Sequence, residues 1–283
     1  MIHILAAKIF CFLLILLLFT VCVFYIPIGY LISLVSVKWS IKITSVFSYC
    51  LWEICGWIFN MTYTVIEEPN KDTDETNKSN IIDKYLIISN HQAALDFMIL
   101  NHLFPSHGTL KYLIKSQTKY YPIFYQIINL LKFIIVSRDY NKDKHNIKNI
   151  INLLLNNKIK NSIVIFPEGT RMNNINLKRS REYIANKNRN NQNILLNNVL
   201  YPRHKGFELI HEILVKHKYK IADLTFHNMN KMKLWEIFFT SKKGIIKYDL
   251  RIVDIEDVRE PKEWLEESFI RKDRIIENMK RGN

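Results

Sequence analysis

From residue 84 onward, short apolar runs alternate with longer segments in which apolar residues recur every three or four positions. The short runs, which predict β-strands, are YLIIS at 85–89, FIIVS at 133–137 and SIVIF at 162–166. The longer segments, which predict helices, are ALDFMILNHLF at 94–104 and KHNIKNIINLLLNN at 144–157. This alternation is typical of an α/β fold in which helices flank a central, largely parallel β-sheet.

The first 65 residues follow a different pattern, because charged residues almost disappear from them. Residues 9–37 carry no charge, and as a helix they would be ~44 Å long, which exceeds the ~30 Å hydrocarbon core of a bilayer. Pro27 and Gly29 interrupt this stretch, so it fits either one tilted span or a helix that enters the bilayer, kinks and returns. Residues 43–65 are also apolar, and their Trp and Tyr content suits an interfacial or second membrane helix. We therefore expect residues 1–65 to be an N-terminal membrane-associated helical segment, with both spanning and surface-lying arrangements open.

Polar segments divide the remainder of the chain. Residues 66–83 predict a polar linker, so we expect the main domain to run from 84 to 283. Within it, the Asn-rich, low-complexity segment 186–193 predicts a solvated insertion. The final periodic segment, 261–279, predicts an amphipathic helix.

The charge of the chain indicates an anionic partner. The net charge is +14 at pH 7, which suits nucleic acid, an anionic membrane surface or a phosphorylated substrate. The interleaved aromatic and basic residues of an RNA-binding sheet are missing from the sequence, which argues against nucleic acid. The four cysteines lie within the apolar first fifth of the chain and lack metal-ligand spacing, so we predict no metal site, disulfide framework or cysteine nucleophile.

The first candidate for chemistry is the pair His91 and Asp96, in the stretch SNHQAALD. On one continuous helix, side chains five residues apart would point about 140° apart, so the pair can meet only if His91 lies outside the helix and Asp96 in its first turn. The end of the strand at Ser89 provides that break. Such a pair would let the carboxylate fix the imidazole tautomer while the other ring nitrogen takes a proton from a hydroxyl. Alone, the pair could also arise by chance in a chain with nine histidines.

A second polar cluster follows the strand at 162–166 and has the sequence FPEGTR. Gly169 permits a tight turn, and exposed turn amides together with Arg171 predict an anion-binding pocket. Arg138 likewise follows the strand at 133–137. Because polar groups follow three predicted strands, we expect a site at the carboxyl edge of the sheet.

These motifs together resemble the glycerolipid acyltransferase family, whose members carry an NHx4D block and an FPEGTR block in this order. FIIVSR at 133–138 resembles a further family block, and VLYPRHKGF at 199–207 is similar to the block of the lysophosphatidate and lysocardiolipin acyltransferase branch. ADLTF at 222–226 and EWLEESFIRKD at 263–273 also resemble that branch. Departures include Tyr125-Gln126 in place of Gly-Trp, and His204 in place of threonine. They bear on acyl-chain and head-group preference rather than on the reaction.

The resemblance implies the family fold for a catalytic domain at 84–283, and transfer of a fatty acyl group from acyl-CoA to a lysophospholipid hydroxyl. His91 would be the general base and Asp96 would orient it. Arg138 and Arg171 would hold the acceptor phosphate, and Glu168, Gly169 and Thr170 would form the same substrate pocket. Lys115 would add positive charge near the acceptor or the CoA phosphates. Neither a metal nor a bound cofactor is required, since acyl-CoA is a co-substrate. The resemblance also implies the endoplasmic reticulum membrane, with the active site facing the cytosol.

Several acceptors fit the sequence. We favour 1-acyl-sn-glycerol 3-phosphate because that activity is common in the branch, but lysocardiolipin, lysophosphatidylinositol and glycerol 3-phosphate are alternatives, as is a CoA-independent transacylase. A different class of function is a non-catalytic, membrane-anchored protein that binds anionic lipid. The sequence leaves acyl-chain preference, regiochemistry and oligomeric state undetermined.

Overall fold

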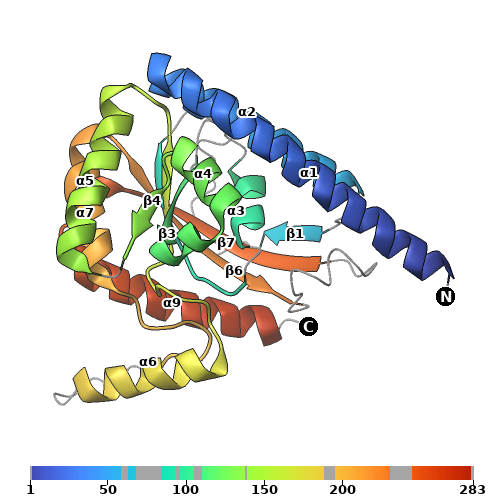
Figure 1. Cartoon of the computed structure of the whole chain (residues 1–283). Helices are drawn as coiled ribbons and strands as arrows, with labels where there is room; N and C mark the ends of the chain where they lie inside the picture. The colour runs from blue at the N-terminus through green and yellow to red at the C-terminus, as the bar shows by residue number, and fades with distance from the viewer. Residues whose placement is uncertain are drawn as a thin grey trace.

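A computed structural model describes residues 2–58, 63–67, 84–93, 96–104, 110–137, 139–187, 195–229 and 244–281. Its centre is a seven-stranded sheet with the order β1-β7-β6-β2-β5-β3-β4 (Figure 1). Neighbouring strands are parallel except β6 and β7, which are antiparallel. The predicted α/β class with a largely parallel sheet is therefore confirmed. The strands are β1 (Tyr63–Glu67), β2 (Tyr85–Ser89), β3 (Leu110–Lys115), β4 (Ile134–Val136), β5 (Ser162–Ile165), β6 (Lys220–Asn228) and β7 (Gly244–Asp254).

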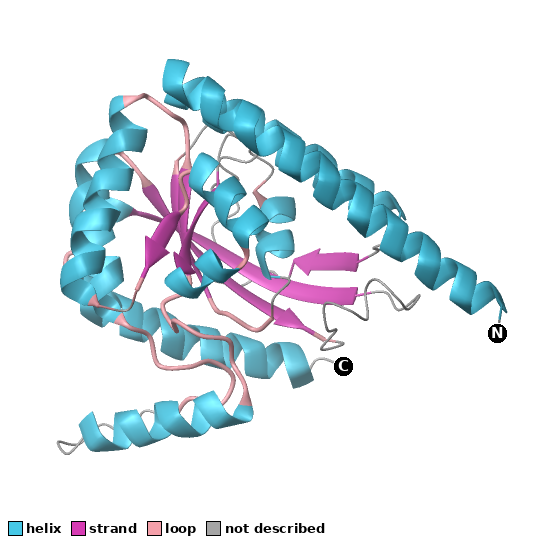
Figure 2. Cartoon of the chain, in the orientation of Figure 1, coloured by secondary structure: helices cyan, strands magenta, loops and turns pink. Residues whose placement is uncertain are grey.

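Helices cover both faces of this sheet (Figure 2). On one side pack α5 (Tyr140–Asn156), α7 (His204–Leu214) and α9 (Pro261–Arg281), and on the other lie α3 (Asp96–Leu103) and α4 (Pro122–Leu130). The helix α6 (Asn174–Lys187) extends away from the sheet (Figure 1). Three short 3₁₀ helices, Ser116–Tyr120, Val215–His217 and Ile255–Asp257, connect elements in the described residues.

Two hydrophobic cores form because successive strand residues point to opposite faces. In β2, Leu86 and Ile88 join the core under α5, α7 and α9, whereas Ile87 joins the core under α3. The central strands are apolar at consecutive positions for this reason, as expected for a sheet buried on both faces. All three residues are fully buried.

The N-terminal residues form a helical hairpin of α1 (Ile2–Val35) and α2 (Val37–Ile58). The two helices contact through the stacked rings of Tyr25 and Phe47, 3.9 Å apart, and α1 continues through Pro27. Of the residues that the structure describes, no helix offers a stretch long and apolar enough to meet the criterion for a membrane span.

Strand β1 follows the hairpin and pairs in parallel with β7 along its whole length. The sheet thus includes a strand from the part of the chain expected to be anchor and linker, and the division into domains stays a prediction. Residues 68–83 of the expected linker and 188–193 of the expected insertion lie outside the described residues, while residues 186 and 187 end α6.

Candidate active site

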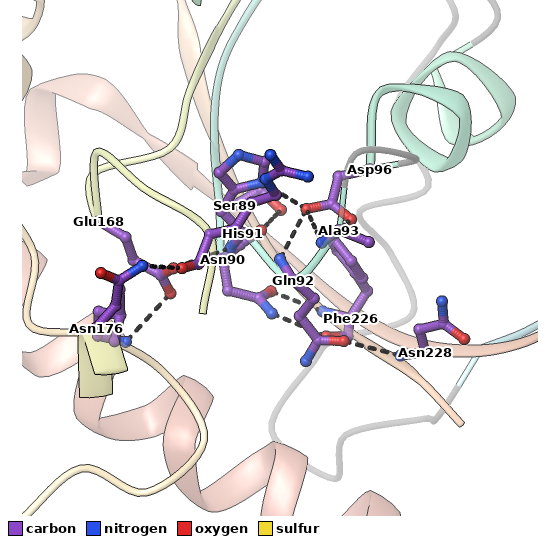
Figure 3. Close-up of polar contacts among 12 residues, drawn as sticks. Ser89, Asn90, His91, Gln92, Ala93, Asp96, Glu168, Asn176, Phe226 and Asn228 are labelled. Atoms are coloured by element: carbon purple, nitrogen blue, oxygen red, sulfur yellow. Dashed lines mark hydrogen bonds and ion pairs between the residues drawn. The ribbon is translucent and has the colours of Figure 1, made fainter. Parts of the chain in front are cut away.

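The site lies where β2 and β5 end, because these neighbouring parallel strands place their carboxyl ends at the same edge of the sheet. The first residue beyond β2 is Asn90, which is fully buried. Its side-chain amide donates to the carbonyl of Phe226 at 2.9 Å and accepts from the Phe226 N–H at 3.0 Å. Gln92 makes a similar contact, since its Oε1 accepts from the N–H of Asn228 at 3.0 Å (Figure 3). Both amides therefore fasten the segment that carries His91 to β6.

His91 and Asp96 form the predicted pair. Asp96 is the first residue of α3, and its Oδ2 lies 2.6 Å from Nδ1 of His91, which stands outside the helix. The same carboxylate accepts from the backbone N–H of Gln92 at 2.8 Å and of Ala93 at 2.9 Å (Figure 3). Because the ionised carboxylate only accepts hydrogen bonds, Nδ1 of His91 carries the proton and Nε2 is left as a base. The geometry predicted for this pair is confirmed.

Burial differs sharply between the two partners. Asp96 is 1% exposed, whereas the His91 side chain is 24% exposed. Burial raises the pKa of Asp96, and the hydrogen bonds from His91 and the two backbone N–H groups oppose this effect. A carboxylate held in this way fixes the imidazole ring while leaving part of it accessible to a substrate.

The FPEGTR segment holds His91 from its other side. The Phe166 ring stacks on the imidazole, with centroids 4.4 Å apart. The His91 N–H donates to Oε2 of Glu168 at 3.3 Å, and the His91 carbonyl accepts from the Met172 N–H at 2.8 Å. Side chain and backbone of the histidine are thus both fixed.

Glu168 links three segments of the site. Its side chain is buried, and its second oxygen, Oε1, accepts from the Leu200 N–H at 3.4 Å. Burial raises the pKa of Glu168 well above its ordinary range, the two backbone N–H donors lower it, Asp96 raises it and Lys272 lowers it. Both oxygens face backbone donors, so the carboxylate shapes the site from within.

The turn after Glu168 carries the predicted anion-binding residues. Gly169 has a φ of +65°, a conformation that favours glycine. Thr170 and Arg171 are held by Asn176, whose Nδ2 donates to Thr170 Oγ1 at 3.4 Å and to the Arg171 carbonyl at 2.9 Å. The Arg171 side chain is exposed.

Arg203 lies over the same turn. A β-carbon built on Gly169 would be 3.5 Å from both Cδ and Nε of Arg203, and the Arg203 N–H donates to the Pro167 carbonyl at 2.8 Å. Within the described part of the chain, no carboxylate lies within ion-pair distance of the exposed guanidinium of Arg203. Two exposed arginines, Arg171 and Arg203, therefore flank the turn.

The remaining candidates are less completely placed. Lys115 ends β3, which neighbours β5, so it lies at the same edge of the sheet and is half-buried. Arg138 lies outside the described residues. In the segments described, no three or more His, Cys, Asp or Glu side chains are grouped so as to hold a metal ion.

Sequence reasoning missed Arg203, Asn90 and Lys272. Arg203 lies inside the quoted block VLYPRHKGF, and Asn90 directly precedes the candidate histidine, so both stood in recognisable motifs. Their partners are distant in the sequence, and a single sequence does not reveal such pairs. Lys272 also lies inside a quoted block, EWLEESFIRKD, but nothing there indicated that it is buried, because a lysine in an amphipathic helix usually faces solvent.

Together, the α/β fold and the oriented histidine beside a basic turn define a class of acyl-transferring proteins. A sequence model of the family described as Acyltransferase matches residues 48–219, which include the dyad and the FPEGTR turn, and the chain belongs to this family. The resemblance inferred from the sequence blocks is confirmed.

Individual relatives refine this assignment. The probable 1-acyl-sn-glycerol-3-phosphate acyltransferase 5 of Arabidopsis thaliana is 33% identical over 44% of this chain and 33% of its own length. The 1-acyl-sn-glycerol-3-phosphate acyltransferase 2 of Brassica napus is 23% identical over 83% of this chain and 62% of its own length. Lysocardiolipin acyltransferase 1 of Mus musculus is 27% identical over 51% of this chain and 42% of its own length. The matched region thus spans between a third and two thirds of these relatives.

Among solved structures, the 1-acyl-sn-glycerophosphate (LPA) acyltransferase PlsC from Thermotoga maritima aligns over 97% of both chains, at 15% identity and a TM-score of 0.48.

Proposed function

We propose that the protein transfers a fatty acyl group from acyl-CoA to the free hydroxyl of a lysophospholipid. We favour 1-acyl-sn-glycerol 3-phosphate as acceptor, which would give phosphatidic acid. The observation that carries the proposal is the dyad, in which a buried carboxylate with three hydrogen-bond donors presents Nε2 of His91 beside the FPEGTR turn. Relatives named for this activity support it.

The reaction requires a base because an alcohol is a weak nucleophile near neutral pH. Nε2 of His91 takes the hydroxyl proton as the acceptor oxygen attacks the thioester carbonyl carbon. Asp96 stabilises the imidazolium that forms. The tetrahedral intermediate then collapses, the carbon–sulfur bond breaks, and the departing CoA sulfur receives the proton from His91.

The acceptor phosphate would lie at the basic turn. We assign Arg171 and Arg203 to it, because both residues are exposed, Arg203 lies against Gly169 and Arg171 follows Gly169 by two residues. A guanidinium group can bind a phosphate bidentately. Lys115, at the same edge of the sheet, would add positive charge, and family resemblance assigns Arg138 a similar part. Replacing Arg203 with alanine should raise KM for a phosphate-bearing acceptor, and lysine should rescue this only partly because it lacks the planar fork.

The α1–α2 hairpin would place the site at a membrane. Its interior contains polar side chains, since the Tyr25 and Thr44 hydroxyls lie 2.8 Å apart and Ser40 donates to the Gly29 carbonyl at 3.1 Å. Large apolar side chains point outward instead: Leu16, Leu17, Phe19, Val21, Val23, Phe24, Ile28, Tyr30, Leu31, Leu34 and Val35 of α1, and Trp39, Ile43, Val46 and Tyr49 of α2. Polar residues between helices and apolar residues outside them suit a lipid environment. We infer that the hairpin lies in the bilayer, where both substrates partition; the endoplasmic reticulum and a cytosol-facing site stay predictions.

The test is an acyltransferase assay on membranes containing the protein, with labelled acyl-CoA and a panel of lysophospholipids. We expect turnover that is lost in His91→Ala and kept in His145→Ala, a matched variant of an exposed histidine on α5. Turnover of no acceptor, or normal turnover by His91→Ala, would overturn the proposal. Binding of anionic lipid without turnover, unchanged in His91→Ala, would favour the non-catalytic alternative.

A second candidate acceptor is lysocardiolipin, because relatives named lysocardiolipin acyltransferase 1 match this chain at comparable identity. The same panel distinguishes the two acceptors. A higher kcat/KM with lysocardiolipin than with 1-acyl-sn-glycerol 3-phosphate would assign a remodelling activity. Lysophosphatidylinositol belongs in the panel because it is the other remodelling acceptor that the sequence resemblance leaves open.

A further inference from the structure

Lys272 of α9 is fully buried directly behind the strands that carry the site. Its Nζ donates to the carbonyl of Leu224 in β6 at 2.6 Å and to the carbonyl of Ile88 in β2 at 3.3 Å, and it forms an ion pair with Asp223. Ile88 is three residues before His91. The ammonium group thus bridges the two strands at the end where His91 emerges.

The charge of Lys272 is well compensated. Asp223 also accepts from Ser268 at 2.8 Å and lies 3.3 Å from Arg271, which itself lies 3.2 Å from Asp249. A buried charge persists only with such partners, since an unpaired one costs several kcal/mol. Burial lowers the pKa of Lys272, and the charges of Asp223 and Asp249 oppose this effect. The network therefore holds the Lys272 ammonium group at a fixed point beneath the site.

Asp273, which follows Lys272 in α9, binds the segment on the other side of the site, at residues 197 and 198. Its Oδ1 accepts from the N–H groups of Asn197 at 2.8 Å and Asn198 at 2.6 Å, and its backbone carbonyl accepts from the side chain of Asn198 at 3.0 Å. Leu200 lies two residues after Asn198, and its N–H donates to Glu168. Asp273 thus fixes the segment that positions one of the two donors to Glu168.

We propose that Lys272 and Asp273 are positioning residues. Through these two side chains, one turn of α9 holds both β2 and the 197–200 segment. It thereby sets the position of His91 relative to Glu168. Lys272 contacts the strand that leads to His91, and Asp273 contacts the segment that leads to Glu168. The proposal deepens the proposed function and rests on it for its kinetic consequences only.

The charge of Lys272 supplies a second effect. It lowers the pKa of Glu168, which burial and Asp96 raise. Without Lys272, the pKa of Glu168 would be higher, so as the pH falls Glu168 would be protonated sooner than in the wild type. The N–H groups of His91 and Leu200 both donate to this carboxylate, and one of them would then lose its acceptor. The charged groups around Lys272 are Asp223, Arg271 and Asp249, and those around Glu168 are Asp96 and Lys272 itself.

The decisive variant is Asp223→Asn combined with Lys272→Met. The single change Lys272→Met would leave Asp223 charged and buried, and the protein could fail to fold. The double change removes both charges together, while Arg271 keeps Asp249 as a partner. Arg274→Met, which alters an exposed residue of the same helix, is the matched control.

We expect the double variant to unfold within a few degrees of the wild type. Its peptides covering 89–93 and 198–201 should exchange amide hydrogens about tenfold faster at pH 7. In the acyltransferase assay, kcat should fall about tenfold with little change in KM, and the acid limb of the pH profile should move to higher pH. Asp273→Asn should accelerate exchange at 198–201 chiefly.

Unchanged exchange at both segments would overturn the proposal, as would faster exchange with an unchanged kcat and pH profile. The exchange measurement does not depend on turnover. If the wild type acylates no acceptor, the proposed function fails while the role of α9 in holding the two segments is still decided.

Discussion

Lys111 of β3 should destabilise the fold near neutral pH, and replacing it with methionine should reveal the effect. Its side chain is fully buried, and its Nζ donates to the carbonyl of Leu131, just after the end of α4, at 2.8 Å. Within the described segments, no carboxylate lies within ion-pair distance of this ammonium. Burial lowers the pKa of Lys111 from 10.5 to about 7.

The size of the effect follows from the difference between these two pKa values. Because the folded-state pKa lies below the unfolded one, the unfolded chain binds the proton first as the pH falls, so stability is lost between about pH 10 and pH 7. For each pH unit below the unfolded-state pKa, the free energy of unfolding falls by about 1.4 kcal/mol. The loss is therefore about 4 kcal/mol at pH 7 and about 2 kcal/mol at pH 9. Lys111→Met removes this loss but leaves the Leu131 carbonyl without its donor, at a cost of about 1–3 kcal/mol.

The expected result is a variant about 2 kcal/mol more stable than the wild type at pH 7, and no more stable than it at pH 9. Denaturant unfolding of the detergent-solubilised protein at several pH values measures this difference. Other titrating groups cancel because both proteins share them. Lys160→Met, at an exposed lysine, should show no such pH dependence. A difference between wild type and Lys111→Met that stays constant from pH 7 to pH 9 would refute the reasoning.

Three further predictions concern the site. Asp96→Asn should lower kcat on the order of 100-fold or more, because the amide no longer fixes the imidazole tautomer. Steady-state assays measure kcat, and a near-normal value would show that Asp96 does not orient His91. Gly169→Ala should cost about 1 kcal/mol, because its φ of +65° is strained for alanine, whereas the added Cβ would meet Arg203 only at van der Waals distance, 3.5 Å. Denaturant unfolding measures the loss, and an unchanged free energy of unfolding would contradict the strain at this turn. Asn90→Ala should lower stability by about 2–5 kcal/mol, because the N–H and carbonyl of Phe226 both lose a buried partner; a thermal shift of less than a degree would show that water replaces the amide.

Much of the fold was predictable because its strands are apolar, and the central ones are buried on both faces. Such strands appear as uninterrupted apolar runs, and β2, β4 and β5 were located from these runs alone. The order of the sheet was not predictable. It depends on which strands meet, and the antiparallel pairing of β6 with β7 leaves no mark on the composition of either strand.

For the site as well, contacts between residues close in sequence were predictable, and contacts between distant residues were not. His91 and Asp96 were predicted together because their contact is local, so the break between strand and helix decides their geometry. The partners of Glu168 could not be predicted, since Leu200 lies 32 residues away and the Lys272 charge lies farther still. A glutamate after a strand also fits a substrate pocket, and only the packed structure shows its two oxygens facing backbone donors.

If the α1–α2 hairpin lies in the bilayer as proposed, the attachment of β1 to the sheet would fix the height of the site above it. Only residues 59–62 separate the end of α2 at Ile58 from the start of β1 at Tyr63, and β1 is hydrogen-bonded along its length to β7. A connection this short leaves the sheet little freedom to tilt or lift relative to the hairpin. With the hairpin at a set depth in lipid, His91 would act at one level, that of the glycerol hydroxyls, and hydroxyls deeper or shallower would be out of reach. Regiochemistry would then be selected by depth as well as by the pocket.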